Sequence, residues 1–344
     1  MLLQKFNEAL SGSADVAQNS YLMHLRPAVE QVEASLTKIP GLKFYEQTLL
    51  RLLDEKYFPL KPKLTNFFAQ TLGEAHFWAM CEKKGVPLRR VPELAGKKTP
   101  DFEASYGSAA AACFEVKTLS VVSGEYGIDE CLHSSVEANV EIEAKLKRGD
   151  KVAMAESEAR PYGKRPSEEG ALTAVINTLI EKAEQNIKQD QFANRPTFLV
   201  LNLSVIPPMV TKPVALRPSY PDDYLFDKAV TGEMWAMAFG RIGMPIQVNP
   251  EFEGKPCVEA ILDKVGILES EEFKCVAGIL FMVHPWNEPS QIWGLYRRSD
   301  WTTWEDVDPD LIKLLFDITG DVNWNDDGDC NGWRIAQSVY MDEP

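Results

Sequence analysis

The chain has 344 residues, of which 45% are hydrophobic and 25% are charged, a composition typical of a globular protein with ample apolar material for a core. No run of 18 apolar residues occurs, so we expect no membrane-spanning helix and no membrane partner. The formal net charge of −15 argues against a protein that binds nucleic acid over its whole surface. The six cysteines are far apart and form no C-x-x-C pair, which favours free thiols and a cytoplasmic location.

The charged residues are distributed unevenly along the chain. Residues 299–344 hold twelve Asp and Glu residues against Lys313 and Arg334, a balance of −10, and we call this stretch the acidic tail. A basic cluster lies before residue 101 and consists of Lys83, Lys84, Arg89, Arg90, Lys97 and Lys98. Because phosphate binding needs only a locally positive field, we predict that this cluster binds nucleic acid. The alternative is a solvated charged surface.

The first 70 residues predict a helical extension. Apolar residues recur at three- and four-residue spacing over 42–53 and 64–80, and prolines near residues 40 and 59 interrupt the pattern. The second of these helices is expected to end near Lys84, because Gly85-Val86-Pro87 follows it.

The middle of the chain predicts strands and helices in alternation. Residues 99–119 are expected to form a pair of strands, and residues 120–170 either an inserted helical segment or a flap. Residues 171–189 carry an amphipathic helical stripe. Residues 197–205 form a continuous apolar run, typical of a strand that is buried on both faces.

The last third of the chain continues the mixed pattern after a proline-rich connection. It predicts two helices, at about 222–239 and 257–265, and two strands, at 274–284 and 291–297. We therefore predict an α/β fold, with a central mixed β-sheet flanked by helices and at least one crossover helix. The expected organisation is a helical extension over 1–70, a core over 71–210, and an α/β elaboration over 211–344 that continues the core sheet.

The most informative residues lie in Thr99-Pro100-Asp101-Phe102 and in the apolar segment 113–119. Alternate residues of a strand project to the same side, so Glu115 and Lys117 should share one face. Two charged residues on a buried strand cost free energy unless they meet partners or a metal ion.

The turn between the two strands decides which side Asp101 faces. A loop with an even number of residues would place Asp101 opposite Phe114, on the wrong face. A three-residue turn at 107–109, or a bulge, gives paired residue numbers that sum to 216 and places Asp101 opposite Glu115. We predict this second register.

Two neighbouring carboxylates beside an ammonium group suit a hard, oxygen-seeking cation such as Mg²⁺ or Mn²⁺. Such an ion polarises a phosphodiester and lowers the pKa of a bound water, and Lys117 can orient that water or stabilise the transition state. Glu103 shares the face of Asp101 and is an alternative ligand. The competing interpretation is an exposed hairpin with a surface salt bridge, which would contribute little free energy.

Residues 71–205 resemble the PD-(D/E)XK (restriction-endonuclease-like) nuclease superfamily. The resemblance rests on a helix that bears Glu74, then Gly85-Val86-Pro87, the Thr99–Phe102 strand, the Phe114–Lys117 strand, a later helix with Lys182 and Gln185, and an apolar strand. It implies that Asp101 and Glu115 bind the metal and that Lys117 is the catalytic lysine. It also implies that Glu74 is an accessory acid and that Lys182 and Gln185 support the site. The segment of roughly fifty residues after Lys117 is longer than in compact members.

The resemblance implies a Mg²⁺-dependent nuclease that hydrolyses phosphodiester bonds, with DNA as the expected substrate, of a restriction, repair or phage-defence type. A homodimer or a protein partner is compatible with this interpretation. One alternative is a non-catalytic interaction protein on a nuclease fold, whose acidic C-terminal part binds a protein partner. Another is a nuclease whose acidic tail covers its own basic cleft.

Overall fold

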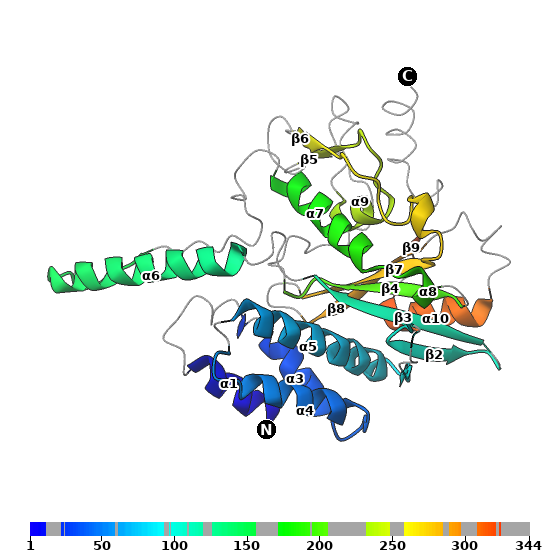
Figure 1. Ribbon diagram of the computed structural model, residues 1–344, viewed down its shortest axis with the longest axis horizontal. Coiled ribbons are helices and arrows are strands. Elements are labelled where there is room, and N and C mark those ends of the chain that lie inside the picture. Colours follow the sequence, from blue (N-terminus) through cyan, green and yellow to red (C-terminus); the bar gives the residue numbers. More distant parts are fainter. Residues whose placement is uncertain are drawn as a thin grey trace. The chain divides into compact units, whose positions relative to one another are not determined.

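The computed structural model describes residues 1–11, 22–23, 25–58, 61–92, 96, 98–108, 110–119, 126–155, 171–192, 195–205, 232–247, 258–284, 289–296, 308–320 and 323–324. The chain divides into two compact units. The first comprises Met1–Ala79, Ser120–Arg165 and Val205–Pro207, and the second comprises Met80–Leu119, Pro166–Ser204 and Pro208–Pro344. Figure 1 shows the elements of both units.

The first unit is helical in the part of it that the structure describes. Its helices are α1 (Leu2–Ser11), α3 (Arg26–Ser35), α4 (Leu42–Leu53), most of α5 (Pro62–Lys83) and α6 (Tyr126–Lys147). Apolar residues of α1, α3, α4 and α5 at three- and four-residue spacing form the core of this unit, where the ring of Phe6 stacks on that of Phe68 at 5.7 Å. Gly41 at the start of α4 is required by packing, because an added Cβ would lie 2.2 Å from the Trp78 ring.

The helical extension was predicted, but its boundary was not. The expected division between residues 70 and 71 falls inside α5, which runs without interruption to Lys83. The end of α5 agrees with the prediction, since Gly85 adopts a positive φ of 79° directly after it. In the segment 120–170, α6 is helical as one of the two alternatives proposed, and residues 156–170 lie outside the described residues.

The second unit is built on one mixed sheet. Its strands are β1 (Arg89–Arg90), β2 (Phe102–Tyr106), β3 (Ala110–Thr118), β4 (Thr197–Asn202), β7 (Gly278–Val283), β8 (Gln291–Tyr296) and β9 (Asn323–Trp324), in the order β1-β2-β3-β4-β7-β8-β9. β1, β2 and β3 pair antiparallel, whereas β3, β4 and β7 are parallel. β8 is antiparallel to β7 and parallel to β9. Of the strands beyond residue 210, β7, β8 and β9 therefore lie in the same sheet as the β2–β3 hairpin.

Helices cover both faces of this sheet (Figure 1). α7 (Ala171–Asn186) and α8 (Gln189–Phe192) connect β3 to β4, and α9 (Glu233–Phe239) follows β4. Right-handed crossovers place these helices on one face, while the reversed direction of β8 and β9 places α10 (Pro309–Thr319) on the other. Four buried side chains of α10, Leu311, Leu314, Leu315 and Ile318, belong to the core. The stretch predicted as an acidic tail thus contains a core helix.

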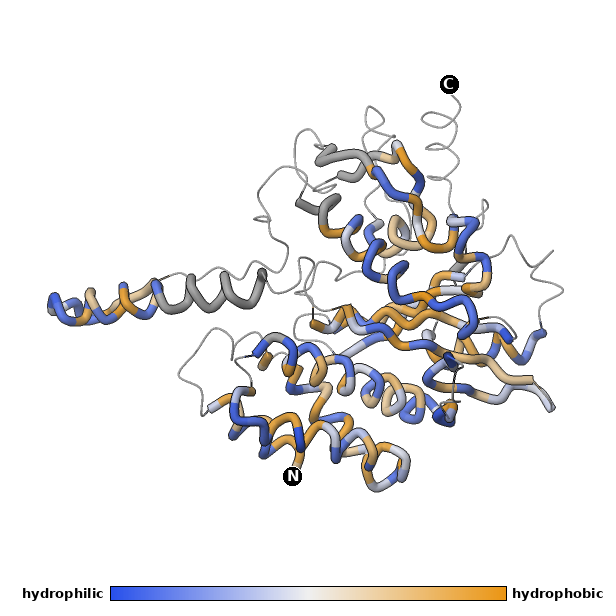
Figure 2. The backbone as a smooth tube through the Cα atoms, viewed as in Figure 1, coloured by the Kyte–Doolittle hydropathy of each residue, from blue (hydrophilic) through white to orange (hydrophobic). Residues whose placement is uncertain are grey.

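The two central strands are buried along their whole length. Every residue of β4 and β7 is buried, and Figure 2 shows how hydrophobic the strands at the centre of the sheet are. An aromatic row crosses the sheet on the face of α10, where Phe198 lies 5.8 Å from Phe114 and 6.0 Å from Tyr296. Gly278 leaves room for the Tyr296 ring in this row, because an added Cβ at position 278 would lie 2.7 Å from Tyr296 Cδ1.

One predicted element has the wrong secondary structure. The helix expected at about 257–265 is instead the strand β6 (Val258–Ile261), which pairs antiparallel with β5 (Pro245–Gln247). A short apolar run fits both periodicities, and the partner strand decides between them. Of the helix expected at 222–239, residues 233–239 form α9 and residues 222–231 lie outside the described part.

Candidate active site

The β2–β3 hairpin has the register that was predicted. Phe102 pairs with Phe114 and Tyr106 with Ala110, so the paired numbers sum to 216. The chain reverses direction between Tyr106 and Ala110, and Gly107 has the positive φ of 60° that such a turn favours. Because alternate residues share a face, Glu103, Cys113, Glu115 and Lys117 project to the side of the sheet opposite the aromatic row.

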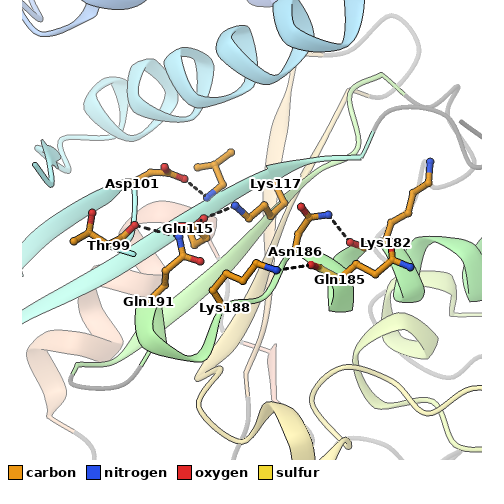
Figure 3. A network of polar contacts seen from close by, with 10 residues as sticks. Thr99, Asp101, Glu115, Lys117, Lys182, Gln185, Asn186, Lys188 and Gln191 are labelled. Carbon is orange, nitrogen blue, oxygen red and sulfur yellow. Dashed lines mark hydrogen bonds and ion pairs between the residues drawn. The ribbon is translucent and has the colours of Figure 1, made fainter. Parts of the chain in front are cut away.

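Glu115 is a buried carboxylate with one oxygen bound and one unbound. The residue is 1% exposed. Its Oε1 accepts hydrogen bonds from Lys117 Nζ and from Gln191 Nε2, the latter at 2.8 Å (Figure 3). Its Oε2 is buried and has no hydrogen-bond partner among the described residues. Burial raises the pKa of Glu115, and the Lys117 ammonium and the Gln191 amide oppose that rise.

Asp101 is fastened to the same strand. Its Oδ2 accepts a hydrogen bond of 2.8 Å from the backbone N–H of Val116, which lies between Glu115 and Lys117. The carbonyl of Asp101 accepts from Val91 N at 3.0 Å, so the segment is also held to the chain that follows β1. Asp101 lies one residue beyond the pair Phe102–Phe114, so the register of the hairpin sets it beside Glu115. Figure 3 shows the two residues on adjoining segments.

Lys117 connects the buried carboxylate to solvent. Its side chain is 24% exposed and forms an ion pair with Glu115, whose side chain is 2% exposed. The three residues predicted to form the site therefore lie together on one part of the sheet. Such an arrangement can hold a cation through two carboxylates and present an ammonium group beside it.

A residue that the sequence did not single out completes the group. Gln191 of α8 is 9% exposed, and its Nε2 donates to Glu115 Oε1 and to the carbonyl of Thr99 at 3.2 Å. The sequence indicates this role only weakly: Gln191 stands beside Phe192, shortly before the apolar run at 197–205.

The two residues predicted to support the site do not make this contact. In Figure 3 the side chains of Lys182 and Gln185 point away from Glu115. Both are on α7, where their carbonyls accept hydrogen bonds from Asn186 and Lys188. Burial lowers the pKa of Lys182.

Glu103, the alternative ligand, is engaged elsewhere. One carboxylate oxygen is paired with Arg89 and the other with Arg195 Nη1 at 2.7 Å. These pairs join β1, β2 and the start of β4. Glu103 is therefore held as a structural anion on the face that carries Glu115.

Two residues of the predicted basic cluster, Lys84 and Arg89, bond to other parts of the second unit. Lys83, Arg90 and Lys98 are exposed, whereas Arg89 pairs with Glu103 and Lys84 Nζ donates to the carbonyl of Ile318 at the end of α10. Burial lowers the pKa of Lys84. Lys97 lies outside the described residues.

Glu74, the predicted accessory acid, belongs to the first unit, where it lies half-buried on α5. The site described above is built from the second unit alone.

The donor atoms fit a magnesium-type ion. Mg²⁺ is commonly held by one or two carboxylates and keeps several waters, and the buried Glu115 Oε2 has no other partner among the described residues. Among those residues, no group of three or more His, Cys, Asp or Glu side chains could hold a metal ion. This finding disfavours a site built from protein ligands alone, such as structural zinc.

Comparison with known proteins adds no relative: no family model, curated protein or solved structure matches the chain. None of the helices in the described residues is long and apolar enough to cross a membrane.

Proposed function

We propose that this chain is a Mg²⁺-dependent nuclease of the PD-(D/E)XK type that hydrolyses phosphodiester bonds, with DNA as its substrate. The observation that supports the proposal best is the buried Glu115, which has Lys117 two residues along the same strand face. One of its oxygens finds no partner in the part of the chain that the structure describes. The connection of an antiparallel strand pair through α7 to a parallel strand also agrees with the resemblance.

In this proposal Asp101 and Glu115 hold the ion. When bound, Mg²⁺ supplies a Lewis acid that polarises the phosphodiester and lowers the pKa of a coordinated water. Lys117, now paired with Glu115 Oε1, would donate its N–H groups to the attacking water or to a phosphoryl oxygen once an ion shares that carboxylate. In the hydrolysis the water oxygen would bond to phosphorus and lose a proton to solvent. The bond from phosphorus to the leaving sugar oxygen would break, and that oxygen would take up a proton from solvent.

The exposed cations Lys83, Arg90 and Lys98 would supply the local positive field for a phosphate backbone. Arg90 is directly connected to the site, since its strand neighbour is Phe102 and the next residue bonds the carbonyl of Asp101. Binding through phosphates is strongly dependent on salt. We therefore expect DNA affinity to fall steeply as the salt concentration rises.

Cleavage of plasmid, single-stranded DNA and RNA tests the proposal, in Mg²⁺, Mn²⁺ or EDTA. The expected result is metal-dependent cleavage of DNA by the wild type and loss of at least about a hundredfold in Asp101→Ala and Lys117→Ala. Lys313→Ala is the matched control, because Lys313 is an exposed lysine paired with Asp317 on α10. Cleavage that persists in both site variants would assign the activity to another site or to a contaminant.

The charge of the C-terminal stretch favours a second candidate, a protein that binds a basic partner. Residues 299–344 hold a balance of −10, and such a surface attracts cationic proteins. This candidate predicts that the folded wild type cleaves no nucleic acid with either metal, and that removal of residues 325–344 weakens capture of a lysine-rich protein.

A further inference from the structure

Gln191 links the two segments that carry the carboxylates of the candidate site. Its Nε2 donates to Glu115 Oε1 at 2.8 Å and to the carbonyl of Thr99 at 3.2 Å. Thr99 lies two residues before Asp101, so a single amide nitrogen bonds both the Asp101 segment and Glu115. The side chain is 9% exposed, which means that water competes little for either hydrogen bond.

Both residues of this contact keep an unpartnered acceptor. Glu115 Oε2 and Gln191 Oε1 are buried, and neither has a hydrogen-bond partner among the described residues. Buried acceptors are normally satisfied by a protein group, an ordered water or an ion. Within the described part of the chain, the Gln191 amide nitrogen is therefore used twice, while these two oxygens are left for a water or an ion.

We propose that Gln191 is a positioning residue for the divalent-cation site, holding Glu115 and the Thr99–Asp101 segment at a fixed separation while leaving Glu115 Oε2 directed to the ion. The inference rests on the proposed function. It adds to that function a residue on α8 that the superfamily resemblance did not single out.

The chemistry of the contact requires an amide at this position. Both hydrogen bonds need an N–H donor, because Glu115 Oε1 and the Thr99 carbonyl are acceptors. Methionine has a similar length and flexibility and fills the space without a donor. Residues that orient a metal ligand typically change metal affinity by about 10–100-fold when they are replaced.

Manganese binding by the full chain, without nucleic acid, tests the inference. We expect calorimetry to show Mn²⁺ affinity about tenfold or more weaker in Gln191→Met than in the wild type. Gln47→Met is the matched control, because Gln47 is an exposed glutamine on α4 in the first unit, which contributes no residue to the site. Thermal unfolding in EDTA checks that both variants are folded.

A second readout separates positioning of the ion from packing. Electron paramagnetic resonance of the bound Mn²⁺ should change in line shape between the wild type and Gln191→Met, because Glu115 is no longer held by the amide. A merely structural role for Gln191 would lower stability and leave that spectrum unchanged.

The outcomes separate this inference from the proposed function. If the wild type binds Mn²⁺ and Gln191→Met binds it equally well, the positioning role is overturned and the nuclease proposal stands. If the folded wild type binds no Mn²⁺, the proposed function is overturned, and with it any cation role of Gln191.

Discussion

Replacing Lys117 by Met should make the stability of the protein strongly dependent on pH. The substitution removes the cation that is paired with a carboxylate of which only 1% is exposed. Lys117 is the main group that opposes the effect of burial on the pKa of Glu115. Without it, Glu115 must either remain charged in an apolar environment or take up a proton.

The size and sign of the effect follow from the burial of the pair. Loss of one partner of a buried ion pair costs about 3–5 kcal/mol, and we expect about 3 kcal/mol because the Lys117 side chain is partly exposed. The variant raises the folded-state pKa of Glu115 further above its unfolded value. The native state then binds the extra proton, so the free energy of unfolding falls as pH rises through that window.

Urea unfolding at several pH values, in EDTA, measures this prediction. A single proton changes the free energy of unfolding by at most about 1.4 kcal/mol per pH unit, so about two pH units of acidification remove a penalty of about 3 kcal/mol. The double variant Lys117→Met with Glu115→Gln should recover most of the loss at alkaline pH, because no buried charge remains. A loss that is independent of pH, or a double variant as unstable as Lys117→Met, would refute the reasoning.

Three further predictions concern packing and charge. Gly278→Ala should destabilise the protein by about 1–3 kcal/mol in urea unfolding, because its Cβ would lie 2.9 Å from the Leu295 carbonyl; an unchanged midpoint would contradict the packing of the sheet. Glu103→Gln should cost only about 1 kcal/mol in the same assay, since both of its arginine partners are mainly exposed, and a much larger loss would show that Glu103 does more than anchor β1. Deletion of residues 325–344 should strengthen DNA binding severalfold at low salt, with little change at high salt. If the truncated and the full-length protein bind DNA with the same affinity at low salt, masking by this segment is excluded.

The site could be predicted from sequence where local periodicity determines it. Alternation along β3 placed Glu115 and Lys117 on one face, and the three-residue loop at 107–109 determined the register that brings Asp101 beside them. The strands β4 and β7 were recognisable because strands buried on both faces are continuously apolar.

Features that depend on tertiary contacts could not be predicted in this way. Gln191 acquires its role only from the carboxylate that the fold brings to it, 76 residues earlier in the chain. The acidic composition of residues 299–344 concealed α10, whose buried side chains occur within the charged stretch. For the same reason, a deletion that begins at residue 299 would remove part of the core, and the shorter deletion above is the informative one.

Anomalous diffraction from crystals soaked in Mn²⁺ tests the central claim most directly. The account predicts one strong peak between Asp101 and Glu115, at about 2.1–2.2 Å from Glu115 Oε2, with Lys117 Nζ displaced from Glu115 Oε1. No peak at saturating Mn²⁺, or a peak elsewhere with the Lys117–Glu115 pair intact, would contradict it.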